Sequence, residues 1–284
     1  MLMIKIYMKE IMMKSIILPV DYNYIGVFLT LRCNLNCDYC INKQSKLIVR
    51  EELSGRDWIK GLSRIRTRSD LPITLQGGEP TLHKDFYAIA GYFEDTKHFD
   101  LLTNGSFDVD EFINWIMPDL FNRQAKYANI RFSYHKNMNA TALAIKVWNL
   151  QKEGYSVGVW GLSNNDNREI KSLCAGLNID FRVKEYLDKS HGTYKYPEGL
   201  SNKLKRVLCK PSELLIAPDG LIYRCHSDLY AARNPIGYIL DKEIKFPDYL
   251  LCDYFGDCNP CDLKLKTNRF QEYGHCSVEI KEIK

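Results

Sequence analysis

The sequence predicts an α/β fold, in which a partial (β/α)6 TIM-like barrel is followed by a small C-terminal domain that a β-hairpin opens. Between residues 24 and 185, six short β-rich segments alternate with amphipathic segments at helical spacing. This alternation implies a parallel sheet with right-handed crossovers, and chemistry gathers at the carboxyl ends of such strands. A second observation agrees, because the unusual motifs directly follow these segments. We expect an N-terminal extension over 1–23, a core over 24–200 and a C-terminal domain over 201–284.

The strands and helices are predicted in the following order. A β-rich run over 25–31 comes first. Ser54, with Asp57 three residues later, resembles a capping box and predicts a helix that carries Trp58, Leu62 and Ile65 on one face. Further strands are predicted at 72–76, 99–103, 129–134, 156–162 and 179–185, and further helices at 86–93, 109–116, 140–152 and 167–177.

Charge and composition indicate an ordinary globular protein. The chain has 39 Lys and Arg against 35 Asp and Glu, and it shows no block of like charges that would favour nucleic acid. The apolar N-terminus is interrupted by Lys5, Lys9, Glu10 and Lys14, which argues against a signal peptide or a membrane span of about 20 residues. We therefore expect a cytoplasmic protein with no nucleic-acid or membrane partner.

The ten cysteines are unevenly distributed. Secreted disulfide frameworks are usually short and evenly cross-linked, so this distribution favours metal or cluster ligation in a reducing compartment. The isolated Cys174 lies between Leu173 and Leu177 of a predicted helix and is expected in the core. The other nine form an early group of Cys33, Cys37 and Cys40 and a late group of Cys209, Cys225, Cys252, Cys258, Cys261 and Cys276.

The early group directly follows the first predicted strand and has the spacing C-x3-C-x2-C. Three thiolates in one loop suit a [4Fe–4S] cluster, whose fourth iron is then open to a small ligand. A zinc knuckle or a set of buried thiols is the alternative, although zinc sites usually close their shell with a second cysteine pair.

With Tyr39 before its last cysteine, this triad resembles the radical SAM (S-adenosylmethionine) superfamily. The order of motifs supports the resemblance, since Gly77-Gly78-Glu79-Pro80 follows the second predicted strand. In that family the turn lines the amino group of SAM, for which the Glu79 carboxylate is an acceptor. Polar residues after the next strands match further SAM contacts. The resemblance thus implies that SAM is bound by Tyr39, Gly77, Gly78, Glu79, Asn104, Ser106, Ser133 and Leu162.

The resemblance also implies a mechanism. An external donor such as flavodoxin or ferredoxin reduces the cluster, SAM is cleaved to a 5′-deoxyadenosyl radical, and the radical abstracts a hydrogen atom from substrate. The protein positions the substrate and excludes water, while the cofactor supplies the difficult chemistry.

The late group surrounds a predicted hairpin over 212–224, whose turn is Pro218-Asp219-Gly220. The pattern resembles the SPASM and Twitch auxiliary-cluster regions of radical SAM enzymes. Their opening, a cysteine followed by a hairpin and G-x4-C, is matched by Cys209, Gly220 and Cys225. The Twitch type adds one C-x2-C pair, matched by Cys258 and Cys261, which implies an auxiliary [4Fe–4S] cluster.

Two features depart from this pattern. Tyr249 stands where a full SPASM region has a cysteine, and the last gap between cysteines is two residues rather than three. Under the Twitch pattern, Cys252 and Cys276 are left over. These two could ligate an incomplete cluster, replace a Twitch ligand or be buried thiols. The alternative to the auxiliary cluster is a zinc site formed by Cys225, His226, Cys258 and Cys261.

The residues do not identify a substrate. His135 and Glu185, at the ends of the fourth and sixth predicted strands, are the candidate catalytic residues. The triad begins at Cys33, which leaves no room upstream for a leader-binding domain. We therefore expect an oxidoreductase-type enzyme that oxidises or rearranges a small metabolite, similar to the aminocyclitol dehydrogenase group. A peptide or protein maturase with a separate recognition partner, and a non-catalytic iron–sulfur or zinc protein, are the alternatives.

Overall fold

The computed structural model describes residues 13–40, 42, 45–68, 71–93, 98–121, 123–184, 205–246, 248–255 and 278–283. Its centre is a nine-stranded sheet in the order β12-β11-β10-β2-β4-β5-β6-β7-β8. Six of these strands are parallel neighbours in chain order: β2 (Tyr24–Thr30), β4 (Ile73–Gly77), β5 (Phe99–Thr103), β6 (Ile130–Ser133), β7 (Val157–Leu162) and β8 (Asp180–Lys184).

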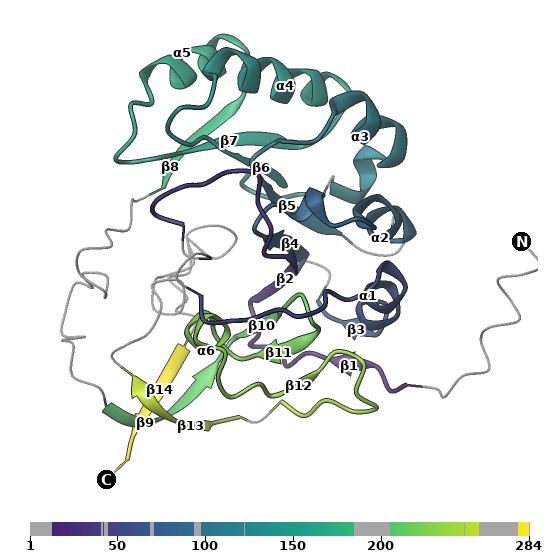
Figure 1. Cartoon of the computed structure of the whole chain (residues 1–284), viewed down its shortest axis with the longest axis vertical. Helices are drawn as coiled ribbons and strands as arrows, with labels where there is room; N and C mark the ends of the chain where they lie inside the picture. Colours follow the sequence, from purple (N-terminus) through teal and green to yellow (C-terminus); the bar gives the residue numbers. More distant parts are fainter. Residues whose placement is uncertain are drawn as a thin grey trace, which may run out of the picture.

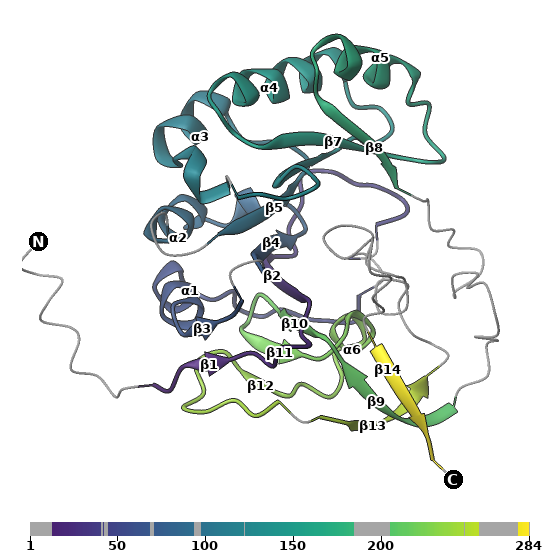
Figure 2. The same ribbon diagram turned by 180° about the vertical axis from the view of Figure 1, so that it is seen from behind.

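Helices cover the outer side of this sheet. In Figure 1 the sheet forms an open arc from β8 to β12, with the helices α1 to α5 along its convex side, and Figure 2 shows the same arrangement from behind. The predicted partial barrel is therefore confirmed, and among the described residues β8 and β12 are the edge strands of the open sheet. The helices are α1 (Gly55–Leu62), α2 (Phe86–Tyr92), α3 (Val109–Trp115), α4 (Ala140–Lys152) and α5 (Arg168–Gly176).

The alternation of side chains along each strand separates the two faces of the sheet. On β2, Ile25 and Val27 are fully buried in the main hydrophobic core, together with apolar residues of the helices. Phe28, which points to the opposite face, belongs to a separate apolar cluster with Leu215 and Tyr223. This is the period-2 pattern expected of a sheet that is covered on both sides.

The first helix begins at a side-chain cap and ends shortly before a new strand. The Ser54 hydroxyl accepts a hydrogen bond from the backbone N–H of Asp57 at 3.2 Å, so the predicted N-cap is confirmed. The prediction that Ile65 belongs to this helix is wrong, because α1 ends at Leu62. Ile65 instead opens the two-residue strand β3 (Ile65–Arg66), which pairs with β1 (Ile16–Ile17).

The predicted hairpin forms and joins the main sheet. It consists of β10 (Glu213–Ile216) and β11 (Leu221–Tyr223), which pair antiparallel, and β12 (Gly237–Tyr238) follows at the edge. Strand β10 lies parallel to β2, with Leu214 opposite Ile25. The main sheet thus continues across the expected boundary near residue 200, while the division into domains stays a prediction.

A second sheet and one helix lie next to the hairpin. The sheet has the order β13-β9-β14, and α6 (His226–Ala231) follows β11 directly. None of the helices in the described ranges is long and apolar enough to cross a membrane. The strands of the second sheet are β9 (Lys205–Pro211), β13 (Leu250–Phe255) and β14 (Val278–Glu282).

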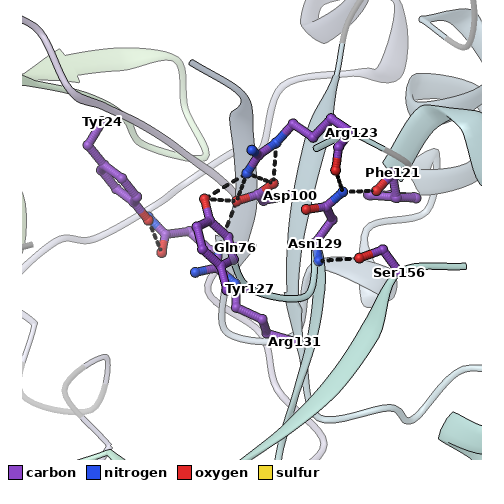
Figure 3. Close-up of polar contacts among 9 residues, drawn as sticks. All are labelled: Tyr24, Gln76, Asp100, Phe121, Arg123, Tyr127, Asn129, Arg131 and Ser156. Carbon is purple, nitrogen blue, oxygen red and sulfur yellow. Dashed lines mark hydrogen bonds and ion pairs between the residues drawn. The ribbon is translucent and has the colours of Figure 1, made fainter. Parts of the chain in front are cut away.

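A buried polar cluster lies at the amino-terminal ends of β5 and β6 (Figure 3). Asp100 accepts hydrogen bonds from Arg123 at 2.8 Å, from Arg131 at 3.1 Å and from the hydroxyl of Tyr127 at 3.1 Å. The side chains of Asp100, Arg123 and Arg131 are 1%, 6% and 3% exposed. Asp100 alternates with core residues along β5, so the cluster lies on the face opposite the helices, at the end of the sheet away from the predicted motifs.

Candidate active site

The loop after β2 and the turn after β4 are joined through their backbones. The N–H of Gly78 donates to the carbonyl of Thr30, and the N–H of Glu79 donates to that of Arg32, both at 2.8 Å. A Cβ atom on Gly77 or Gly78 would lie 2.1 Å from one of these carbonyl oxygens, and Gly77 has a φ of +142°. The two glycines are therefore required by the close approach of the cysteine loop to the turn.

Glu79 is buried completely, and donors of the chain itself surround its carboxylate. Oε1 accepts from the hydroxyls of Thr81 and Thr103 at 2.7 and 2.8 Å, and Oε2 accepts from the N–H of Asn104 at 2.6 Å. Burial raises the pKa of Glu79, and these hydrogen bonds act in the opposite direction. The carboxylate thus connects the ends of β4 and β5, and its contact with SAM stays a prediction.

Asn104 connects the end of β5 to the cysteine loop. Its Nδ2 lies 2.8 Å from Oδ1 of Asn34 and 3.6 Å from Sγ of Cys33. Its Oδ1 accepts from the N–H of Ser106 at 3.0 Å, and the Ser106 side chain is exposed. These three contacts agree with one orientation of the amide.

Lys146, on α4, holds the loop that follows β5. Its ammonium donates to the carbonyls of Gly105 at 2.6 Å and Phe107 at 2.5 Å. Gly105 has a φ of +76°, and the ring of Phe132 fills the space where a side chain would go. The loop after β5 is therefore held on both sides of Ser106.

The three early cysteines lie in one loop, with Cys33 exposed and Cys37 and Cys40 half-buried. Burial raises the pKa of the Cys33 thiol, whereas hydrogen bonds from the N–H of Leu35, at 3.4 Å, and from Asn104 lower it. In the described part of the chain, no three His, Cys, Asp or Glu side chains converge into a metal-binding group. The donor set fits an iron–sulfur cluster, because it offers three soft thiols and N–H donors to the sulfur of Cys33.

His135 follows β6 and reaches the cysteine loop. Its Nδ1 lies 2.7 Å from the hydroxyl oxygen of Tyr39, and the two rings are 5.9 Å apart. Burial lowers the pKa of His135, and the nearby ammonium of Lys184, at the end of β8, acts in the same direction. The imidazole is therefore neutral at pH 7, where it can donate from one nitrogen and accept at the other.

The remaining predicted residues of the early site occupy strand ends. Ser133 is the last residue of β6 and pairs with Trp160 on β7, while Leu162 ends β7 opposite Lys184. Both are half-buried. Glu185, the second candidate catalytic residue, lies outside the described residues, so its role stays a prediction.

The structure adds contacts that support the predicted residues. Asn34, Thr103 and Lys146 hold the predicted residues in place, and Asn42 donates to the carbonyl of Gly77 at 2.6 Å. Asn34 lies inside the C-x3-C loop and Thr103 precedes Asn104, so proximity to the motifs was a usable signal for both. For Lys146 no such signal exists, because its contacts depend on how α4 packs.

Three cysteines of the late group lie in the described residues. Cys209 on β9 is buried, and Cys252 on β13 is half-buried against it. The register places Cys252 opposite Val207, so Cys209 and Cys252 share one face of the sheet. Cys225 caps α6, since its Sγ accepts from the N–H of Asp228 at 3.4 Å. The described residues do not include Cys258, Cys261 and Cys276, which leaves the ligand set of an auxiliary site a prediction.

Two other sequence expectations concern His226 and Cys174. The zinc alternative uses His226, whose Nδ1 lies 3.0 Å from Oε2 of the buried Glu213. Cys174 is fully buried within the main core, as predicted, and burial raises its pKa to about 11.

Comparison with known proteins matches part of the chain to a family. Residues 27–142, which include the triad, the GGEP turn, Asn104 and His135, match the Radical SAM superfamily. Molybdenum cofactor biosynthesis protein 1 of Bos taurus is 25% identical over 204 residues, which are 64% of this chain and 31% of that protein. An S-adenosylmethionine-dependent nucleotide dehydratase of Selenomonas ruminantium is 27% identical over 162 residues, covering 56% of this chain and 54% of the dehydratase.

The fold agrees with this family. The crystal structure of Streptococcus suis SuiB bound to S-adenosylmethionine matches with a TM-score of 0.52 at 12% identity, over 79% of this chain and 62% of SuiB. The chain thus spans less than two thirds of the length of these relatives. On the motifs, the geometry and these matches together, the chain carries a domain of the radical SAM superfamily, whose cofactors are a [4Fe–4S] cluster and S-adenosylmethionine.

Proposed function

We propose that this chain is an oxidoreductase-type radical SAM enzyme that removes a hydrogen atom from a small metabolite and thereby oxidises or rearranges it. One observation carries the proposal. The cysteine loop contacts both the GGEP turn, through the backbone bonds of Gly78 and Glu79, and the end of β6, through Tyr39 and His135. The predicted cluster ligands and the predicted SAM-binding residues therefore meet at the carboxyl ends of neighbouring parallel strands.

In this proposal, Cys33, Cys37 and Cys40 hold the cluster. When bound, the cluster and SAM supply a 5′-deoxyadenosyl radical. The residues of the chain bind SAM, orient the substrate and exclude water from the reacting atoms. Neutral His135 is placed to donate to or accept from a polar group of the substrate, and the exposed Lys184 offers a cation beside it.

The relatives support a small-molecule substrate. Their names include a nucleotide dehydratase and GTP 3′,8-cyclases, such as that of Haemophilus influenzae, which is 32% identical over 108 residues. We infer that a phosphorylated metabolite, nucleotides included, is the first class to test, because Lys184 and His135 suit an anionic or polar group. A flavodoxin- or ferredoxin-type electron donor and a cytoplasmic setting, which keeps free thiols reduced, belong to the same proposal.

A peptide or protein maturase is the second candidate. The observation in its favour is the fold likeness to SuiB bound to its precursor peptide SuiA, with a TM-score of 0.53 at 14% identity over 84% of this chain and 66% of SuiB. Likeness at this identity concerns the fold alone, so the small-metabolite proposal stands first. The Radical SAM match argues against the third alternative, a non-catalytic metal protein.

The test is anaerobic reconstitution with iron and sulfide, followed by incubation with dithionite and SAM. We expect release of 5′-deoxyadenosine by the wild-type protein and none above background by Cys37→Ala. Cys174→Ala is the matched control, since it removes a thiol that is buried in the main core on α5, and it should retain the activity. A wild-type protein with a full complement of iron and no 5′-deoxyadenosine would contradict the proposal.

A further inference from the structure

We propose that Asn104 is a positioning residue that hydrogen-bonds the sulfur of Cys33 and thereby raises the reduction potential of the cluster that Cys33 would ligate. The inference rests on the proposed ligand role of Cys33. Its basis is the 3.6 Å distance from Asn104 Nδ2 to Cys33 Sγ, which lies within the range of an N–H···S hydrogen bond. The donor comes from the end of β5, whereas the sulfur belongs to the loop after β2.

The contacts of the Asn104 side chain determine which end of the amide faces the sulfur. Its oxygen accepts from the N–H of Ser106 at 3.0 Å, a group that can only donate. The nitrogen must therefore point the other way, toward Cys33 and Oδ1 of Asn34. The backbone N–H of Ser106 can only donate, so it fixes which end of the Asn104 amide is the oxygen.

The donor is held firmly before any cluster binds. Asn104 is 8% exposed, and its backbone N–H donates to Glu79, which is completely buried. Thr103 donates to the same carboxylate, and Lys146 holds the carbonyls on either side of Ser106. Such support keeps a donor in place at little cost in conformational entropy when the cluster binds.

Electrostatics gives the direction of the effect. A reduced cluster carries one more negative charge than the oxidised cluster, and this charge is shared with the thiolate sulfurs. An N–H donor to such a sulfur therefore stabilises the reduced state more than the oxidised state and raises the potential. Cys33 has two such donors, the N–H of Leu35 within its own loop and Nδ2 of Asn104 from β5.

Three substitutions separate this hydrogen bond from its surroundings. Asn104→Ala removes the donor, and Asn104→Asp keeps the size of the side chain but replaces the donor with a carboxylate beside the sulfur. Asn34→Ala is the matched control, because it removes the other partner of Nδ2, at 2.8 Å, and leaves the donor to Cys33 in place. Asn34 is exposed, so its loss should not disturb folding.

The measurement is potentiometric titration of the full-length, reconstituted protein without SAM, followed by electron paramagnetic resonance. Parallel samples with SAM identify the signal of the triad cluster, because SAM perturbs that signal alone. At a fixed potential, we expect the ratio of reduced to oxidised cluster to fall roughly 3- to 10-fold in Asn104→Ala, equivalent to about 30–60 mV for one electron. The fall should be larger in Asn104→Asp and less than about twofold in Asn34→Ala.

The outcomes distinguish this inference from the proposed function. An unchanged ratio in Asn104→Ala with full iron content would overturn the inference alone, as would an equal shift in Asn34→Ala. If Asn104→Ala does not fold, Asn104→Asp decides, and an unchanged or higher ratio in that variant contradicts the inference. A wild-type protein without any SAM-sensitive signal would overturn the proposed function, and this inference with it.

Discussion

The hydroxyl oxygen of Tyr39 lies 2.7 Å from Nδ1 of His135, although the two residues are 96 positions apart in the sequence. This contact connects the cysteine loop, which follows β2, to the end of β6. Strand β6 is the third strand along the sheet from β2. Tyr39 immediately precedes Cys40, so the contact links His135 to the loop that carries the triad. Substitutions in this pair therefore test how protonation of His135 affects the stability of the protein.

The first prediction concerns the pH dependence of stability. Burial lowers the pKa of His135, and Lys184 acts in the same direction, so the unfolded chain takes up a proton at higher pH than the folded chain does. As pH falls below the unfolded value of about 6.5, protonation favours the unfolded state until the folded pKa is also passed. His135→Gln, which can still hydrogen-bond Tyr39, should therefore lose less stability than wild type between about pH 8 and pH 5.

The measurement for this prediction is the midpoint of anaerobic thermal unfolding at a series of pH values. Tyr39→Phe is the control, because it removes the hydrogen bond but keeps the titrating ring, and it should retain the pH dependence of wild type. Parallel pH profiles for wild type and His135→Gln would show that His135 does not carry this proton linkage.

The second prediction concerns the buried cluster in Figure 3. Asp100→Asn leaves the guanidinium groups of Arg123 and Arg131 without their shared carboxylate. Uncompensated buried charge of this kind costs about 3–5 kcal/mol of the free energy of unfolding. Asp180→Asn is the matched control, since it breaks the half-exposed pair with Arg182.

Urea denaturation under anaerobic conditions measures both variants of the second prediction. The exposed pair should contribute at most about 1 kcal/mol. Equal losses for Asp100→Asn and Asp180→Asn would mean that the cluster is not the stabilising element that its burial indicates.

The third prediction concerns the glycines of the GGEP turn. A Cβ atom at Gly78 would lie 2.1 Å from the carbonyl oxygen of Arg32, so Gly78→Ala must separate the turn from the cysteine loop. We expect iron bound at the triad and the free energy of unfolding to fall together, the latter by roughly 1–3 kcal/mol. The control is Gly176→Ala at the end of α5, where nothing lies within 4 Å of the added atom.

Iron analysis and urea denaturation test the third prediction. Gly176→Ala should be neutral or more stable by up to about 1 kcal/mol, because alanine favours a helix over glycine. If Gly78→Ala bound iron and unfolded like wild type, the close approach of the two loops would not be required for the site.

Much of the fold follows from local sequence patterns, and the departures have physical reasons. Each predicted core strand forms within two residues of its expected position, because a short β-rich run is a local property of the chain. Ile65 has helical spacing but lies in β3, since its pairing with Ile16 outweighs local propensity. The parallel pairing of β10 with β2 was not predictable from the hairpin pattern, because it depends on residues far apart in the chain.

The same distinction applies to the candidate site. Motif residues such as Glu79 were predictable, because their spacing relative to the strands is local. A supporting residue such as Lys146 was harder to find, because its contact with Gly105 spans 41 positions. Side chains that position a motif leave no spacing signal when they come from another element.

The last prediction concerns how the cysteines divide between sites. If the Twitch-like prediction holds, the wild-type chain binds two [4Fe–4S] clusters, so reconstitution should give about eight iron atoms per chain. Cys33→Ala and Cys225→Ala should each reduce this number to about four, and only Cys33→Ala should abolish cleavage of SAM, because the two residues belong to different sites. Cys174→Ala is the control with unchanged iron, as expected for a thiol that is fully buried in the core. About four iron atoms with one zinc in the wild-type protein would favour the zinc site, and about twelve iron atoms would favour a second auxiliary cluster that includes Cys252 and Cys276.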